Sequence, residues 1–150
     1  PASHTELTWF RANDYPVYKR SQVLGVISEG MRTVAVAGTH GKTTTSTLTT
    51  HLLHACGISC NAFLGGVARN FSSNFVKGTT DWVVVEADEF DRSFLTLHPD
   101  LATIMSMDAD HLDIYGDEET LLKTGFLAFA QQLKPGGRLL VKAGLETHYE

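Results

Sequence analysis

A glycine-rich turn that ends in lysine and threonine is the segment of this sequence with the clearest chemistry. It reads Gly-Thr-His-Gly-Lys-Thr-Thr and lies between an apolar run and a stretch of helical character. Backbone N–H groups at the start of a helix attract anions, and glycine lets the backbone approach a phosphate closely. Lys42 would reach the outer phosphates of a nucleotide, and the Thr43 hydroxyl would be one ligand of Mg²⁺. The candidate nucleotide-binding residues are Gly38, Thr39, His40, Gly41, Lys42, Thr43 and Thr44.

The turn departs from the general phosphate-loop pattern at one position. That pattern has a glycine five residues before Gly41, where this chain has Val36. The loop is therefore predicted to be a shortened variant in which Gly38 is the first usable glycine. A chance glycine-rich turn that binds nothing is the alternative, and the position directly after an apolar strand disfavours it.

A cluster of carboxylates follows the most apolar of the predicted strands. Glu86, Asp88, Glu89 and Asp91 lie within six residues of one another, and such crowding of like charges is costly unless a cation shares it. Side chains alternate in an extended segment, so Glu86 and Asp88 are expected to face one way. Because a hard divalent ion prefers oxygen ligands, the cluster is a candidate cation site. A solvated acidic turn is the alternative.

A histidine flanked by carboxylates follows a third predicted strand. His111 lies within the run at residues 108–113. Right-handed crossovers bring the ends of parallel strands to one edge of a sheet, where ligands bind in open α/β folds. The phosphate loop, the acidic cluster and His111 would then meet in one crevice, as a nucleotide bound through magnesium requires. On its own, His111 would be read as a surface or hydrogen-bonded histidine.

The apolar pattern predicts the elements that position these residues. Strands are predicted at 33–37, 58–64, 81–87, 101–105 and 138–141, and helices at 22–29, 42–55 and 117–133. Alternation of strands with helices predicts an α/β fold, a mostly parallel sheet flanked by helices. Residues 1–18 show no sustained period and are interpreted as an entry segment or a linker.

Composition excludes several classes of protein. No apolar run approaches the roughly 20 residues that a membrane-spanning helix needs, and a net charge of -5 argues against general binding to a nucleic-acid duplex. We therefore expect neither a membrane nor a nucleic acid as a partner. The two cysteines do not suggest a disulfide scaffold, and no secretory leader pattern is visible, so a cytoplasmic location is expected.

Three runs of residues together resemble the central ATP-binding domain of the Mur ligases of peptidoglycan synthesis. They are GTHGKTTT at 38–45, EADEFDRSFL at 86–95 and DADHLDIYGD at 108–117. The resemblance covers nearly the whole chain from Met31 onward. It implies a P-loop-containing, mostly parallel sheet, and ATP and Mg²⁺ as cofactors.

The resemblance also implies a role for each matching residue. Lys42 would bind the β- and γ-phosphates, while Thr43 and Glu86 would hold one magnesium ion. His111 would hold a second magnesium ion between the γ-phosphate and the substrate carboxylate, and His40 would lie near the muramoyl substrate. Lys42, Glu86 and His111 are thus the implied catalytic residues.

The implied reaction joins L-alanine to the lactyl carboxylate of UDP-N-acetylmuramate. The carboxylate attacks the γ-phosphate to give an acyl phosphate and ADP, and the amine of L-alanine then displaces phosphate. A related ligase that recycles murein tripeptide shares parts of the same runs and is one alternative. An NTP-binding module without ligase activity is the other.

The same resemblance predicts how the chain is divided. Residues 1–30 are expected to be a linker and an opening helix, and residues 31–150 the front part of the central ATP-binding domain. The family's N-terminal UDP-binding domain and its C-terminal domain do not fit into 150 residues. The chain is therefore expected to be a fragment that does not ligate on its own.

Overall fold

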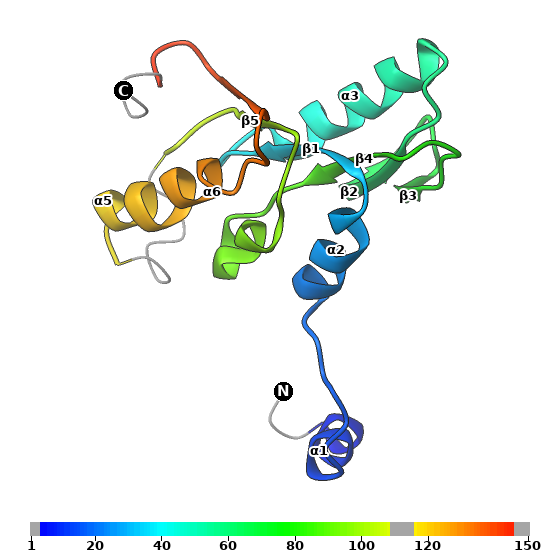
Figure 1. The fold of residues 1–150 in the computed structure, drawn as a ribbon, viewed down its shortest axis with the longest axis vertical. Coiled ribbons are helices and arrows are strands. Elements are labelled where there is room, and N and C mark those ends of the chain that lie inside the picture. Colours follow the sequence, from blue (N-terminus) through cyan, green and yellow to red (C-terminus); the bar gives the residue numbers. More distant parts are fainter. Residues whose placement is uncertain (1–3, 109–115, 146–150) are drawn as a thin grey trace.

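The fold is a six-stranded, mostly parallel sheet with helices on both faces, as seen in the computed structural model (Figure 1). The structure describes residues 4–108 and 116–145. The strand order is β3-β2-β4-β1-β5-β6, and β3 alone runs antiparallel to its neighbour. The strands are β1 Arg32–Ala37, β2 Asn61–Ala68, β3 Ser73–Val76, β4 Trp82–Glu86, β5 Leu101–Ile104 and β6 Arg138–Val141. The predicted α/β class is confirmed.

The helices connect these strands and cover the sheet. They are α1 Thr5–Ala12, α2 Arg20–Glu29, α3 Lys42–Ala55, the 3₁₀ helix η1 Phe90–Thr96, and a continuous segment made of α5 Glu118–Leu121, the π-helical η2 Leu122–Leu127 and α6 Ala128–Ala130. In α3, the predicted bounds and the observed bounds coincide. The helix predicted at 117–133 is present but contains a π-helical turn in its middle, a form that is rare outside short insertions.

The central strands are buried on both faces, which explains their nearly continuous apolar runs. Alternate residues of β1 and β4 belong to different cores: Ala35 and Val85 to one, Val34 to the other. The first core is completed by stacked aromatic rings, Phe94 of η1 and Phe129 of α6, whose centroids lie 4.9 Å apart. The helix α3 contacts β1, β2 and β4 and covers the second core.

Two segments differ from the sequence-based prediction. The second strand was predicted at 58–64 but runs over Asn61–Ala68, through Gly65 and Gly66, and then pairs with the unpredicted β3. Glycine weakens a strand, so the pair of glycines predicts its end. The N-terminal segment was predicted to lack regular structure but contains α1, which begins at the cap residue His4 and buries none of its described residues.

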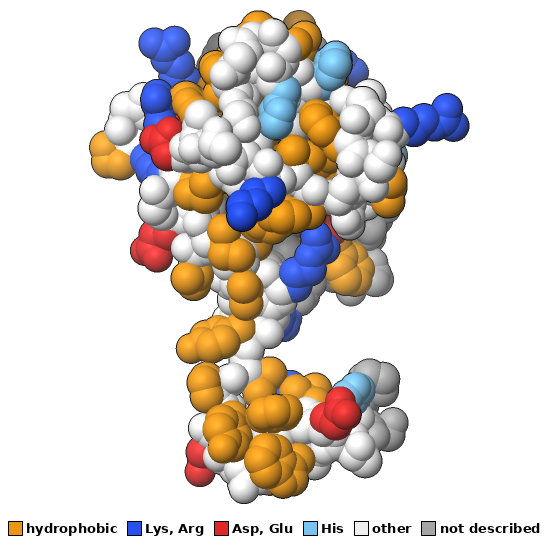
Figure 2. Space-filling view, turned by 90° about the vertical axis from the view of Figure 1, so that its right-hand side faces the viewer, with side chains coloured by type: hydrophobic (Ala, Val, Ile, Leu, Met, Phe, Trp, Pro, Cys, Tyr) orange, Lys and Arg blue, Asp and Glu red, His pale blue; other side chains and the backbone are white. Residues whose placement is uncertain are grey.

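The helix α1 lies apart from the sheet, at the end of an extended segment that leads to α2 (Figure 1). Its apolar side chains are exposed, and Figure 2 shows them gathered on α1 and along the connecting segment. The Trp9 ring stacks on Tyr15 and meets Phe10 edge to face. None of the described helices is long and apolar enough to cross a membrane.

A partly buried network at the opposite end of the sheet from the phosphate loop joins three segments. The Asp100 carboxylate accepts hydrogen bonds from the Thr33 amide and from Lys134 Nζ, both at 2.8 Å. Lys134 also donates to the Met31 carbonyl at 2.8 Å. Burial alone raises the pKa of Asp100, but the hydrogen bonds from Lys134 and Thr33 and the positive charges of Lys134 and Arg32 outweigh it, so the pKa lies below its ordinary value.

We predict that Asp100→Asn lowers the free energy of unfolding at pH 7. Because the native pKa of Asp100 lies below that of the unfolded chain, its stabilisation is present above about pH 4 and is lost as the pH falls through the native pKa. Urea denaturation at several pH values should therefore show a difference from wild type that shrinks on acidification. The exposed Asp81, changed to Asn, is the control; an equal, pH-independent loss in both variants would contradict the prediction.

Candidate active site

The phosphate loop connects the end of β1 to the start of α3, and two glycines give it its shape. Gly38 has φ 128° and Gly41 has φ 81°, a backbone region that favours glycine. A Cβ on Gly38 would lie 2.8 Å from the Ser106 amide nitrogen, so this position also lacks space for a side chain. The loop can therefore approach the segment after β5 closely only with glycine here.

A short polar segment after β5 anchors the loop. Thr39 Oγ1 and Ser106 Oγ lie 2.9 Å apart, and the His40 amide donates to Ser106 Oγ at 2.7 Å. The Asp108 amide donates to Thr39 Oγ1 at 3.1 Å. This segment leads to residues 109–115, so the predicted site residue His111 lies outside the described residues. Ser106 was not predicted, because a lone serine carries no recognisable pattern.

The two other polar loop residues face solvent. The His40 side chain is 70% exposed, and its Nε2 lies 3.7 Å from an Asp108 carboxylate oxygen. Thr44 is exposed in the first turn of α3, beside the equally exposed Thr43. These side chains are therefore accessible to a ligand that approaches the loop from solvent.

Lys42 points back over the loop and forms an ion pair with a buried carboxylate. Its Nζ lies 2.8 Å from the Gly38 carbonyl oxygen and 2.8 and 3.0 Å from the two carboxylate oxygens of Glu89. The Lys42 side chain is 14% exposed, and that of Glu89 is completely buried. Glu89 was part of the predicted acidic cluster but was not named as a site residue. It provides a local negative charge that holds the lysine against the loop.

Glu86 joins the ends of three segments beside the loop. Its Oε1 accepts a hydrogen bond from Thr43 Oγ1 at 3.0 Å, and its Oε2 accepts one from the Gly65 amide of β2 at 2.8 Å. Ser46 Oγ lies 3.5 Å from Oε2. The predicted pair of Thr43 and Glu86 is thus brought together, at the positive end of the α3 dipole.

The donor set of this pair fits magnesium. Mg²⁺ is bound by few protein oxygens, commonly a carboxylate and a hydroxyl beside substrate phosphates, and retains several waters. Thr43 Oγ1 and Glu86 Oε1 would be such ligands. In residues 4–108 and 116–145, no group of three histidine, cysteine or acidic side chains converges as a further metal site.

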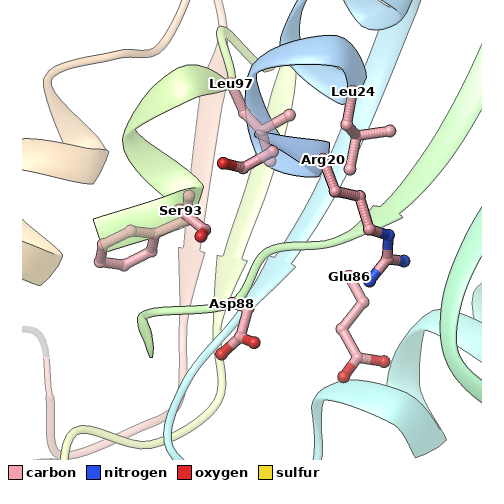
Figure 3. A pocket seen from close by; sticks show the side chains of 8 residues that line it. Arg20, Leu24, Glu86, Asp88, Ser93 and Leu97 are labelled. Carbon is pink, nitrogen blue, oxygen red and sulfur yellow. The ribbon is translucent and has the colours of Figure 1, made fainter. Parts of the chain in front are cut away.

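The remaining described carboxylate of the acidic cluster lies in a cavity on the far side of Glu86 from Thr43. Glu86 and Asp88 line this cavity together, as the alternation in an extended segment predicted, and Ser93 of η1 lines it too. Figure 3 shows Arg20, from the first turn of α2, reaching toward Glu86. Arg20 was not predicted as a site residue, because α2 precedes the phosphate loop and carries no motif of its own.

Comparison with known proteins gives consistent results along the chain. The family described as Mur ligase middle domain matches residues 36–147. The UDP-N-acetylmuramate–L-alanine ligase of Cytophaga hutchinsonii is 48% identical over 98% of this chain and 32% of that protein. The chain thus spans about a third of the length of the curated relatives it matches.

Solved structures show the same fold. The UDP-N-acetylmuramate-alanine ligase of Thermotoga maritima superposes with a TM-score of 0.82 at 27% identity, over 96% of this chain and 33% of that one. The UDP-N-acetylmuramate:L-alanyl-gamma-D-glutamyl-meso-diaminopimelate ligase of Neisseria meningitides gives a TM-score of 0.86 at 22% identity, over 99% of this chain and 52% of that one. The second likeness concerns the fold alone.

We predict that Gly65→Ala displaces the Glu86 carboxylate. A Cβ on Gly65 would lie 2.2 Å from Glu86 Oε1, whereas a Cβ on the neighbouring Gly66 would meet its nearest atom, Thr43 Cγ2, at 3.5 Å. Because the Glu86 carboxylate is the free end of a flexible side chain, it can swing away at little cost in stability.

The matched pair Gly65→Ala and Gly66→Ala tests this geometry. In the longer protein, Gly65→Ala should weaken Mg²⁺-dependent nucleotide binding about tenfold or more, as loss of a charge-assisted contact does, and Gly66→Ala should leave it near wild type. Binding would be followed by calorimetry with a Mg²⁺ titration. Equal affinity in the two variants would refute the steric argument.

We also predict strong energetic coupling between Lys42 and Glu89. Removing one partner leaves a charge in a largely buried place, which costs about 3–5 kcal/mol in comparable pairs. Lys42→Met and Glu89→Gln should each destabilise the fold, and the double variant should lose less than the sum of the two. A double-mutant cycle by urea denaturation measures this coupling; strictly additive losses would show that the pair does not interact.

Proposed function

Because the chain belongs to the Mur ligase family, whose middle domain matches residues 36–147, we propose that the longer protein containing it is an ATP-dependent carboxylate–amine ligase. In this proposal it joins L-alanine to the lactyl carboxylate of UDP-N-acetylmuramate. Support comes from relatives about half identical to it that bear the name of this activity. The geometric observation that carries the proposal is the contact of Thr43 with Glu86 at the start of α3.

The described residues provide the groups that phosphoryl transfer to a carboxylate needs. The loop amides and Lys42 would bind the nucleotide phosphates, and Thr43 and Glu86 would hold a magnesium ion, which supplies positive charge beside the γ-phosphate. An attacking carboxylate and a polyphosphate are both anions, so fixed positive groups lower the barrier to their approach. Lys42 would exchange its contact with Glu89 for one with phosphate.

The proposed reaction has two steps. An oxygen of the lactyl carboxylate bonds to the γ-phosphorus, and ADP leaves. The amine of L-alanine then attacks the acyl carbon, loses a proton and expels phosphate. We assign His111 to a second magnesium ion in the first step, and His40 to contact with the muramoyl substrate; both roles rest on the resemblance of their motifs.

The division of the chain and the setting of the reaction belong to the same proposal. Residues 31–150 would be the front part of the central ATP-binding domain and residues 1–30 its linker and opening helix. The UDP-binding and closing domains would lie in other parts of the longer protein, so the isolated chain should not ligate. A reaction that consumes ATP and a UDP-sugar is consistent with the cytoplasm, and its substrates are small molecules rather than nucleic acids or membranes.

The test is ADP formation by the longer protein. We predict that it depends on both UDP-N-acetylmuramate and L-alanine, and that Lys42→Ala reduces it at least a hundredfold, since the lysine contacts the transferred phosphoryl group. ATP turnover indifferent to both substrates would instead identify an NTP-binding module. Turnover with murein tripeptide in place of L-alanine would identify the recycling ligase.

A further inference from the structure

We propose that Arg20 binds an oxyanion of the acceptor substrate, its carboxylate or its diphosphate, and holds it beside Glu86. The inference rests on the proposed function and adds a binding residue to it. Arg20 lies before the matched family region, which begins at residue 36. Neither the sequence motifs nor the comparisons assign it a role.

The position of Arg20 places a positive charge on the open side of the site. It is the first residue of α2 and is exposed. It lines three neighbouring cavities, and Glu86 and Asp88 line two of these with it. Figure 3 shows its side chain directed from α2 toward the end of β4, where Glu86 and Asp88 lie. The positive charge of Arg20 therefore lines the same cavities as Glu86 and Asp88.

No partner within the described part of the chain occupies this guanidinium. Thr43 and Gly65 bind the Glu86 carboxylate, and the Phe90 amide donates to Asp88 Oδ1 at 3.1 Å. Among residues 4–108 and 116–145, the Arg20 side chain forms no hydrogen bond or ion pair. Its planar fork of donors therefore remains available, and this geometry matches a carboxylate or a phosphate bidentately.

Glu86 separates two approaches to the reaction centre. On one side lie Thr43 and the phosphate loop, which fit the nucleotide. On the other side lies Arg20, at the point where the extended segment from α1 enters α2. An anionic acceptor that arrives on this second side must pass Glu86 and Asp88, which repel it, so a cation is required there. Arg20 is the described cation in that wall of the cavity.

The cavity also fits the apolar part of such an acceptor. One of the three cavities is lined by Arg20 together with Val23, Leu24, Ile27 and Phe63. A ligand with an oxyanion at one end and methyl groups nearby would contact both kinds of surface. A nucleoside triphosphate has a long polar chain of phosphates, so we do not expect it to bind at this apolar face.

Equilibrium binding to the longer protein tests the proposal without turnover. Calorimetry would compare UDP-N-acetylmuramate and Mg²⁺-ATP as probes in Arg20→Gln, Arg20→Lys and a control, Arg138→Gln. Arg138 is exposed at the start of the edge strand β6, whereas Glu86 ends the inner strand β4. We expect Arg20→Gln to lower the affinity for the UDP-sugar about tenfold or more and to leave the affinity for ATP within twofold of wild type. The UDP-sugar affinity of Arg20→Lys should lie between those of wild type and Arg20→Gln.

UDP alone, which has the diphosphate but lacks the carboxylate, separates the two oxyanions. If Arg20→Gln weakens UDP as much as the whole substrate, Arg20 binds the diphosphate; if UDP affinity is unchanged, Arg20 binds the carboxylate. Either result supports the proposal. The proposal would be overturned if Arg20→Gln bound the UDP-sugar as tightly as the control Arg138→Gln does. It would also be overturned if Arg20→Gln lost ATP affinity to the same extent as UDP-sugar affinity.

The same variants keep the two proposals distinguishable. Suppose that Arg20→Gln loses UDP-sugar affinity, but ADP formation by the wild-type protein does not depend on L-alanine. These results would support the proposed role of Arg20 and reject the proposed ligase activity. If the wild-type protein is an active ligase but Arg20→Gln binds the UDP-sugar as tightly as wild type, the proposed ligase activity is supported. The proposed binding role of Arg20 is then rejected. Failure of the wild-type protein to bind the UDP-sugar would reject both.

Discussion

The carboxylate of Glu86 is the contact on which the geometry of this site depends. One of its oxygens binds the hydroxyl at the start of α3 and the other binds a backbone amide of β2, at 3.0 and 2.8 Å. It therefore fixes the phosphate loop relative to two strands of the sheet. A side chain on residue 65 would occupy the place of this carboxylate, so the contact of the carboxylate with the residue 65 amide depends on glycine.

A negatively charged protein that is proposed to bind anions must separate its charges locally. The net charge is -5. The phosphate loop nevertheless presents positive groups, namely its backbone amides, the N-terminal end of the α3 dipole and Lys42. Completely buried Glu89 offsets the charge of Lys42 in this structure. Such a pair costs desolvation energy, so it adds little net stability. Its physical consequence is a lysine held in place near the phosphates it is proposed to bind.

Sequence patterns predicted those parts of the site in which local chemistry decides the structure. The strand before the loop, its glycines and the helix after it follow from apolar runs and backbone freedom, and the bounds of α3 agree with the prediction. Glu89, Ser106 and Gly65 escaped prediction because their roles arise from contacts between distant segments. A charge run is usually solvated, and only the turn from β4 into η1 places Glu89 inside the protein. A glycine pair usually ends a strand, but β2 continues through it and pairs with β3 at Ala68.

The two sides of Glu86 differ in whether their cation is already paired within the described part of the protein. On the loop side, Lys42 is already satisfied by Glu89 and the Gly38 carbonyl, so a nucleotide must compete with contacts within the protein. On the α2 side, no described residue pairs with Arg20, while Asp88 and Glu86 stand beside it. An anion that enters there gains a charge-assisted contact without breaking one. If the proposed nucleotide and acceptor both bind beside Glu86, the cations on its opposite sides would each hold one of the two anions.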